Sequence, residues 1–143
     1  MSNVIPFNHD GAVSMVPEQN VTPTELVRLL CSLVIDSELV DDQIFISDGL
    51  DTACAIKFYE EAKLIQFETQ MVWKQSTVPT LRKLNQAHVD LVMVRFYLLD
   101  RETMCADYFM TYDGGLNVPQ FVRQLRRFAK IATTIEVDPF GDE

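Results

Sequence analysis

Histidines, paired carboxylates and glycine-rich loops are the features that most often carry catalysis or metal binding, and this chain of 143 residues has few of them. The two histidines, His9 and His88, are far apart and lack the H-x-x-x-H spacing of a metal pair. Glu60 and Glu61 are adjacent in a predicted turn, where neighbouring side chains point apart. No nucleotide-binding glycine loop and no G-x-S-x-G nucleophile elbow occurs. The sequence therefore predicts no catalytic residue, no metal site and no cofactor.

The other composition signals also point away from a reaction centre. Cys31, Cys54 and Cys105 are widely spaced in apolar surroundings without a C-x-x-C pair, so we interpret them as small buried hydrophobic residues of a reducing compartment. The formal net charge of −9 argues against a nucleic-acid partner, because phosphate binding needs a positive surface. No apolar run reaches the roughly 18 residues of a membrane-spanning helix, and the N-terminus lacks the basic start of a secretory signal. A cytoplasmic protein without a membrane partner is expected.

The last predicted helix carries a positive stripe in this acidic chain. Its members recur at three- and four-residue spacing, which places them on one side of a helix: Arg123, Arg126, Arg127 and Lys130. One interpretation is a solvated face that balances nearby acids such as Glu136 and Asp138. The other is a docking surface for an acidic partner.

The elements that must position these residues follow from periodicity and turn signals. Thr22, Pro23 and Glu25 form a capping signal for a first helix, whose apolar residues continue to Val34. The later elements are expected as strands 43–47, 52–59 and 65–73, a short helix after 77–80, strands 89–99 and 104–112, and a last helix opened by Asn117. The order is thus α-β-β-β-α-β-β-α. We expect a flexible arm over residues 1–21, one domain over 22–137 and an acidic tail over 138–143.

The strand predicted over 89–99 is apolar at nearly every position, which is typical of a strand covered on both faces. One face forms an unbroken row of Val92, Val94, Phe96 and Leu98. Arg95 interrupts the other face, which consists of Leu91, Met93, Arg95, Tyr97 and Leu99. Because this second face is too apolar to leave bare, we expect it to form a dimer or partner interface.

Asn85 is the polar residue that stands out next to this strand. It lies beside Leu84 at the end of the predicted short helix. Its amide can bond to the backbone at the turn into the strand, which is a structural role, or it can contact a ligand. The structural role is our interpretation.

The L-x-x-L-N pattern at Leu81 to Asn85, the long apolar strand and hairpin, Gly114-Gly115 and the amphipathic last helix together resemble the YbjN family. Its members are bacterial proteins labelled as sensory transduction regulators, and they are similar in fold to the small dimeric chaperones of type III secretion. The resemblance covers residues 22–137. It implies an α+β domain with a five-stranded antiparallel sheet, and a homodimer that binds other polypeptides or regulates through contact. We expect structural roles for Asn85, Gly114 and Gly115.

Two classes of function remain open. The first is a non-enzymatic interaction protein, either a chaperone-like binder of polypeptides or a regulatory adaptor, whose partners are a second copy of the chain and another protein. The second is a small-ligand binder or an enzyme with scattered polar residues, for instance Arg95, Tyr97 and Tyr108. A closed polar pocket favours the second class, and a flat or grooved apolar surface favours the first.

Overall fold

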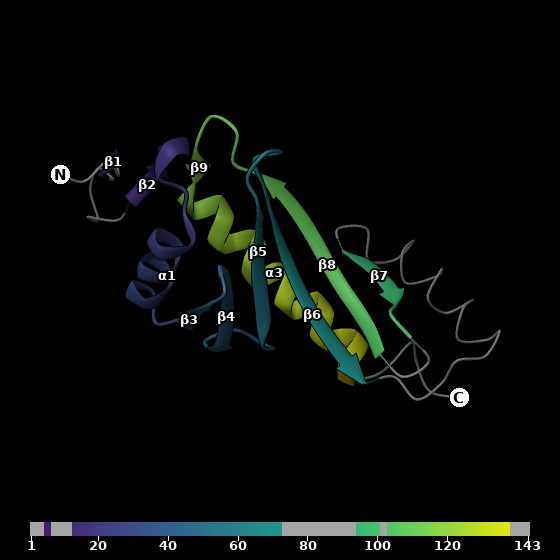
Figure 1. Ribbon diagram of the computed structural model, residues 1–143. Coiled ribbons are helices and arrows are strands. Elements are labelled where there is room, and N and C mark those ends of the chain that lie inside the picture. Colours follow the sequence, from purple (N-terminus) through teal and green to yellow (C-terminus); the bar gives the residue numbers. More distant parts are fainter. Residues whose placement is uncertain (1–4, 7–12, 73–93, 101–102, 138–143) are drawn as a thin grey trace.

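The computed structural model describes residues 5–6, 13–72, 94–100 and 103–137, and it places a mixed sheet-and-helix domain there (Figure 1). Its elements are β1 (Ile5–Pro6), β2 (Val13–Val16), the 3-10 helix η1 (Glu18–Asn20), α1 (Pro23–Ser32), β3 (Asp36–Val40), β4 (Gln43–Asp48), β5 (Cys54–Tyr59), β6 (Leu64–Val72), β7 (Arg95–Leu98), β8 (Thr103–Thr111), β9 (Leu116–Asn117) and α3 (Val118–Val137). Asn85, Leu91 and Met93 lie outside the described residues, as do His88 and the predicted short helix.

The large sheet is antiparallel, with the strand order β3-β4-β5-β6-β8-β7. It has six strands, so the expectation of five was wrong. The strand that was missed is β3, which has the sequence DSELV and is exposed along most of its length. An edge strand of this kind buries no regular apolar face, so it lacks the twofold pattern that identified β4, β5 and β6.

The described part of the strand predicted over 89–99 lies at the edge of the sheet. β6 pairs with β8 along nine residues on each strand, from Leu64↔Thr111 to Val72↔Thr103, and β7 then pairs on the outer side of β8. β8 and β6 therefore form the middle of this half of the sheet. A continuous apolar stretch identified a strand here, but it could not establish the strand's position in the sheet.

Both described α-helices cover the same face of the large sheet (Figure 1). α1 begins where the sequence predicts, with the Thr22 side chain accepting a hydrogen bond from the Glu25 backbone N–H at 3.2 Å. α3 is capped by Asn117, which accepts from the Gln120 N–H at 2.9 Å. Phe67 of β6 contacts Phe121 and Phe128 of α3, with ring centroids 5.8 and 5.9 Å apart. The core lies between these helices and the sheet.

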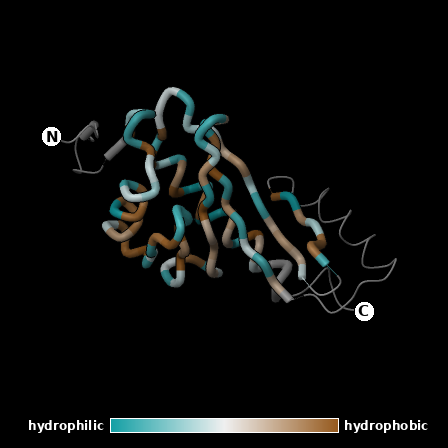
Figure 2. Tube along the Cα trace, in the orientation of Figure 1, coloured by the Kyte–Doolittle hydropathy of each residue, from teal (hydrophilic) through white to brown (hydrophobic). Residues whose placement is uncertain are grey.

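The predicted apolar row on β7 faces this core. Val94 and Phe96 are buried, and Leu98 packs against the core at its margin. Val92, the fourth member, lies outside the described residues. Hydrophobic and hydrophilic residues alternate along several strands of the large sheet, as the colours of Figure 2 show. This alternation separates the core face from the opposite face of the sheet.

Part of the segment expected as a flexible arm belongs to the folded domain. β2 pairs with β9 in a small sheet, and Val16 of β2 is buried. Glu18 then accepts a hydrogen bond from the Gly114 N–H at 2.8 Å and forms an ion pair with Lys63 at 3.3 Å. These contacts join the first part of the chain to the turns after β8 and β5.

α1 ends earlier than its apolar pattern suggests. The backbone N–H of Ile35 donates to Leu30 and that of Val34 donates to Cys31, which is the Schellman pattern of a helix end. Val34 occupies the left-handed position usually taken by glycine, with φ 62°, and its side chain is 80% exposed. The expectation that Leu33 and Val34 extend the buried face of the helix was therefore wrong.

Cys31 is exposed, whereas Cys54 and Cys105 are buried. The interpretation of all three cysteines as buried residues was wrong for Cys31, which lies on the outer side of α1. Within the described ranges, no helix has the length and apolar character to cross a membrane. Those ranges also contain no group of three or more potential metal ligands.

Candidate functional site

The face of the large sheet opposite α1 and α3 carries polar and aromatic side chains across four neighbouring strands. We call it the open face, because neither described α-helix packs on it. Alternation along the paired strands brings the following residues to it: Lys57 and Tyr59 of β5, Gln66 and Glu68 of β6, Asp107 and Phe109 of β8, and Arg95 and Tyr97 of β7.

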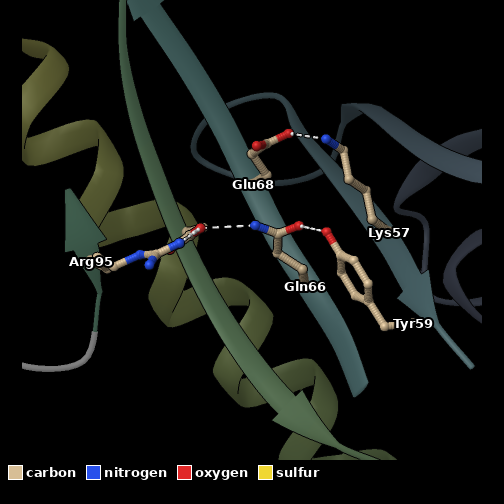
Figure 3. A network of polar contacts seen from close by, with 6 residues as sticks. Lys57, Tyr59, Gln66, Glu68 and Arg95 are labelled. Atoms are coloured by element: carbon tan, nitrogen blue, oxygen red, sulfur yellow. Dashed lines mark hydrogen bonds and ion pairs between the residues drawn. The ribbon is translucent and has the colours of Figure 1, made fainter. Parts of the chain in front are cut away.

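Asp107 is the centre of a hydrogen-bond chain that crosses these strands (Figure 3). Its carboxylate, which is fully buried, receives two hydrogen bonds from the Arg95 guanidinium, at 3.0 Å from Nε and 2.7 Å from Nη2. Gln66 donates to the same carboxylate at 2.8 Å and accepts from the Tyr59 hydroxyl at 2.8 Å. The chain of contacts fixes one residue from each of β7, β8, β6 and β5.

A second contact across these strands is the ion pair between Lys57 of β5 and Glu68 of β6. Its charged atoms lie 2.9 Å apart (Figure 3). The Glu68 side chain is only 11% exposed. A strand with alternating apolar and polar residues usually turns its polar side chains, here Gln66 and Glu68, toward water. Instead both are buried, and their polar atoms are satisfied by partners on the neighbouring strands.

Aromatic rings surround the buried polar chain. The rings of Tyr59 and Phe109 lie 5.9 Å apart, and the Arg95 guanidinium lies 5.0 Å from the Tyr97 ring centroid and 5.9 Å from that of Phe109. Tyr59 is 43% exposed and Phe109 39% exposed. We call Tyr59, Arg95, Tyr97 and Phe109 the aromatic–arginine cluster. The cluster exposes aromatic rings and one guanidinium. The hydrogen bonds that Asp107 and Gln66 make lie beneath these groups.

Four titratable groups of this face have pKa values raised above their ordinary values. Burial raises the pKa of Tyr97 to about 12 and also raises the pKa of the Cys105 thiol. The hydrogen bond with Asp107 raises the pKa of Arg95, and the hydrogen bond with Glu68 raises the pKa of Lys57. Each shift moves away from neutral pH, so these four groups are not tuned for proton transfer or nucleophilic attack at pH 7.

A groove of about 620 Å³ opens beside the Lys57–Glu68 pair. Its walls come from β3, β4, β5 and β6 and include Phe45, which is 42% exposed. The lining mixes apolar and polar side chains and is open along one side. The groove extends the open face toward β4 and gives it a concave part.

The predicted interface residues divide between this face and the undescribed segment. Arg95 and Tyr97 are in the aromatic–arginine cluster, and Leu99, which follows β7, is 57% exposed. Leu91 and Met93 lie outside the described residues. Sequence reasoning missed Tyr59, Gln66, Asp107 and Phe109. A usable signal existed for Asp107, since it is the one acidic residue inside the apolar stretch of β8, just as Arg95 is the one basic residue of β7.

The four basic residues predicted to form a stripe are all exposed on α3. Arg123 and Arg126 line a second groove, of about 420 Å³, together with Leu33, Val118, Pro119 and Val122. This groove lies where the end of α1 meets the first turns of α3. Among the described acidic side chains, none forms an ion pair with Arg123, Arg126 or Arg127.

Gly114 and Gly115 form the turn between β8 and β9, both with positive φ. The Gly115 N–H donates to the Tyr112 carbonyl at 2.9 Å, and the Gly114 N–H donates to Glu18. Their geometry fits the structural role that was assigned to them from the sequence.

A comparison with solved structures relates this geometry to a known protein. The chain matches the crystal structure of Escherichia coli YbjN, a proposed transcription regulator, with a TM-score of 0.66 and 15% sequence identity. The match covers 80% of this chain and 87% of YbjN. The fold is YbjN-like. At this identity the likeness concerns the fold alone. No family model and no curated protein matches the sequence.

Proposed function

We propose that this protein is a non-enzymatic regulatory or adaptor module of bacterial signalling that works as a homodimer and binds other polypeptides, in the manner of a chaperone. The observation that carries the proposal is the aromatic–arginine cluster, with Tyr59 and Phe109 about two-fifths exposed on a sheet face that no described helix covers. Tyrosine, phenylalanine and arginine are enriched in the buried centres of protein interfaces.

The hydrogen-bond chain beneath the cluster supports this proposal. Arg95 is held by two bonds to Asp107, and Tyr59 is held by Gln66. A side chain that is already fixed loses less conformational entropy on binding, so its contacts contribute more to affinity. The face is therefore preorganised for contact.

The comparison is consistent with this class of function. YbjN is a proposed transcription regulator, and a regulator can act through protein contact alone. The formal net charge of −9 of the present chain favours regulation through protein contact over direct binding to nucleic acid.

The test is Phe109→Ala, with Leu39→Ala as the matched control. The two side chains are similarly exposed, at 39% and 41%, but Leu39 lies on the edge strand β3 away from the cluster. Wild-type and variant proteins are immobilised, and the captured proteins are quantified by mass spectrometry; sedimentation velocity gives the oligomeric state. We expect Phe109→Ala to lose a defined set of partners, or the second copy, that Leu39→Ala retains. Equal capture and equal sedimentation for all three proteins would refute the role of this face.

The groove beside Lys57 and Glu68 favours a second candidate, a small-ligand binder. Its volume of about 620 Å³ suits a small molecule, and the ion pair supplies polar groups of both signs on its wall. A thermal-shift screen of metabolites distinguishes the two functions. A compound that raises the melting temperature of the wild type but not of Lys57→Met would support ligand binding.

A further inference from the structure

The groove between the end of α1 and the start of α3 is a second surface with its own chemistry. Its apolar wall consists of Leu33, Val118, Pro119 and Val122, and Arg123 and Arg126 stand beside it. Leu33 is 36% exposed. The groove thus offers apolar contact area next to two cations.

The charge of this surface is opposite to that of the chain as a whole. α3 carries four basic residues and one acidic residue, Glu136, whereas the chain has a net charge of −9. Arg123 and Arg126 form no ion pair with a described acidic side chain. An occupant of this groove should therefore combine negative charge with an apolar anchor.

One segment of the chain itself has this composition. Residues 136–143 read EVDPFGDE, which places four carboxylates around Val137 and Phe140. A phenylalanine flanked by acids matches an apolar groove flanked by arginines. Residues 138–143 lie outside the described part of the chain, so their sequence and their attachment to α3 are the facts used here.

The length of α3 prevents Phe140 from reaching the apolar wall of the groove in its own chain. Arg126 is the lining residue closest to the C-terminal end of α3, and it stands about 16 Å along the axis from Val137 at 1.5 Å per residue. Phe140 is three residues beyond Val137, so an extended chain carries it about 10 Å at most. The apolar wall, near Val118 and Val122, is farther still. Phe140 can therefore pack on this apolar wall only in a second copy of the chain.

We propose that the acidic segment 136–143 of one copy docks in the α1–α3 groove of a second copy, with Phe140 on the apolar wall and the flanking carboxylates on Arg123 and Arg126. Antiparallel α3 helices around a two-fold axis place each C-terminal end beside the other copy's groove, so both segments dock by the same contact. This contact uses a surface separate from the open face and leaves the aromatic–arginine cluster available for a partner.

The first experiment measures docking directly. A fluorescein-labelled peptide of residues 134–143 is titrated with the full-length protein and followed by fluorescence anisotropy. We expect saturable binding that weakens at least tenfold for the double variant Arg123→Glu and Arg126→Glu. The control is Arg127→Glu with Lys130→Glu, which changes the net charge equally on the same helix but does not line the groove. Its binding should weaken less than threefold.

The second experiment separates the apolar anchor from charge. A peptide with Phe140→Ser keeps all four carboxylates and should bind at least tenfold more weakly, and full-length Phe140→Ser should sediment as a smaller species than the wild type. Circular dichroism checks that each variant is folded. No binding of the wild-type peptide, equal loss for the two charge-reversal pairs, or full binding of the Phe140→Ser peptide would each overturn the proposal.

The proposed function of the open face and the docking of segment 136–143 can be refuted independently of each other. Phe109→Ala removes contacts on the open face and leaves the groove intact, so it should bind the 134–143 peptide like the wild type. If Phe109→Ala loses its protein partners while the peptide does not bind to any form of the protein, the proposed function stands and the docking of segment 136–143 is wrong.

Discussion

At the scale of single residues, the buried carboxylate of Asp107 dominates the open face. A charge without solvent contact is costly unless a cation and hydrogen-bond donors surround it, and Asp107 has both in Arg95 and Gln66. The side chain of Arg95 is 61% exposed, so water shares in the stabilisation of the pair. The ion pair thus orders the cluster at a moderate energetic gain.

Arg95→Ala should lower the free energy of unfolding by about 2 kcal/mol, because it leaves the Asp107 carboxylate buried without its cation. Asp107→Asn should cost about 1 kcal/mol, since the amide oxygen still accepts from Gln66. The double variant should be more stable than Arg95→Ala alone, because it removes the unpaired charge. Denaturant unfolding of the three variants measures this coupling. A double variant less stable than Arg95→Ala would show that the charge of Asp107 is not the cause.

Glu18 gives a pH-dependent prediction at the same scale. The hydrogen bond from the Gly114 N–H, followed by the bond with Lys63, lowers the pKa of Glu18 below its usual value of 4.5. A carboxyl group with a lowered pKa in the folded state stabilises the fold above its unfolded pKa, and this stabilisation is lost as the pH falls through the folded pKa.

Glu18→Gln should therefore lower the melting temperature near neutral pH, and the difference from the wild type should shrink as the pH falls below 4.5. Thermal melts of both proteins across this range test it. Glu61→Gln removes one carboxylate at an exposed turn residue and is the control for the change in net charge. A constant difference at every pH would mean that Glu18 acts through shape and not through charge.

At the scale of elements, the turn between β8 and β9 determines how the first part of the chain joins the domain. Gly114 has φ 85° and open space where a Cβ would stand. Gly115 has φ 120°, and a Cβ there would lie 3.0 Å from the end of the Met15 side chain and 3.2 Å from the Val16 carbonyl oxygen. The two glycines are therefore needed for different reasons, namely backbone conformation at Gly114 and both conformation and close approach at Gly115.

Gly115→Ala should destabilise the protein by about 2 kcal/mol, and Gly114→Ala by about 1 kcal/mol. The larger effect arises because a methyl group added at Gly115 meets the backbone of β2, which cannot move without breaking its pairing with β9. Chemical denaturation of the two variants gives the comparison. Equal losses would show that strain in φ alone accounts for both glycines.

At the scale of the whole molecule, two separate surfaces flank one core. The helices cover one face of the large sheet, the aromatic–arginine cluster lies on the other, and the α1–α3 groove lies where the two helices meet. Under the two proposals, the α1–α3 groove joins two copies while the open face receives a partner. β2 and β9 complete the core at the end where the chain enters it.

Val16→Ala tests whether the segment before α1 is part of this core. Val16 is 1% exposed, and removing its two methyl groups should cost roughly 2 kcal/mol through the lost contacts and the cavity left behind. Val40→Ala is the control, because Val40 is 42% exposed on β3 and should cost less than about 0.5 kcal/mol. Equal small effects would show that β2 contributes little to global stability.

Local chemistry made several features predictable from the sequence alone. The Thr22 and Asn117 caps and the described part of the apolar row of β7 each depend on neighbours within a few residues, and the structure confirms them. The spacing of the basic residues likewise predicted their common exposure on α3. Hydrogen bonds within one helical turn, and burial that repeats at a fixed residue spacing, depend on the local sequence. They can therefore be predicted without knowing which distant residues meet.

Only the tertiary structure decided which distant residues meet. β6 pairs with β8 and leaves β7 at the edge, β3 adds a sixth strand without an apolar pattern, and Gln66 contacts Asp107 across 41 positions of sequence. The same pairing places Tyr59 and Phe109 side by side with Arg95. Strand order depends on long-range pairing, which short sequence windows do not encode, so the sequence pointed to Arg95 and Tyr97 while the fold supplied the rest of their surface.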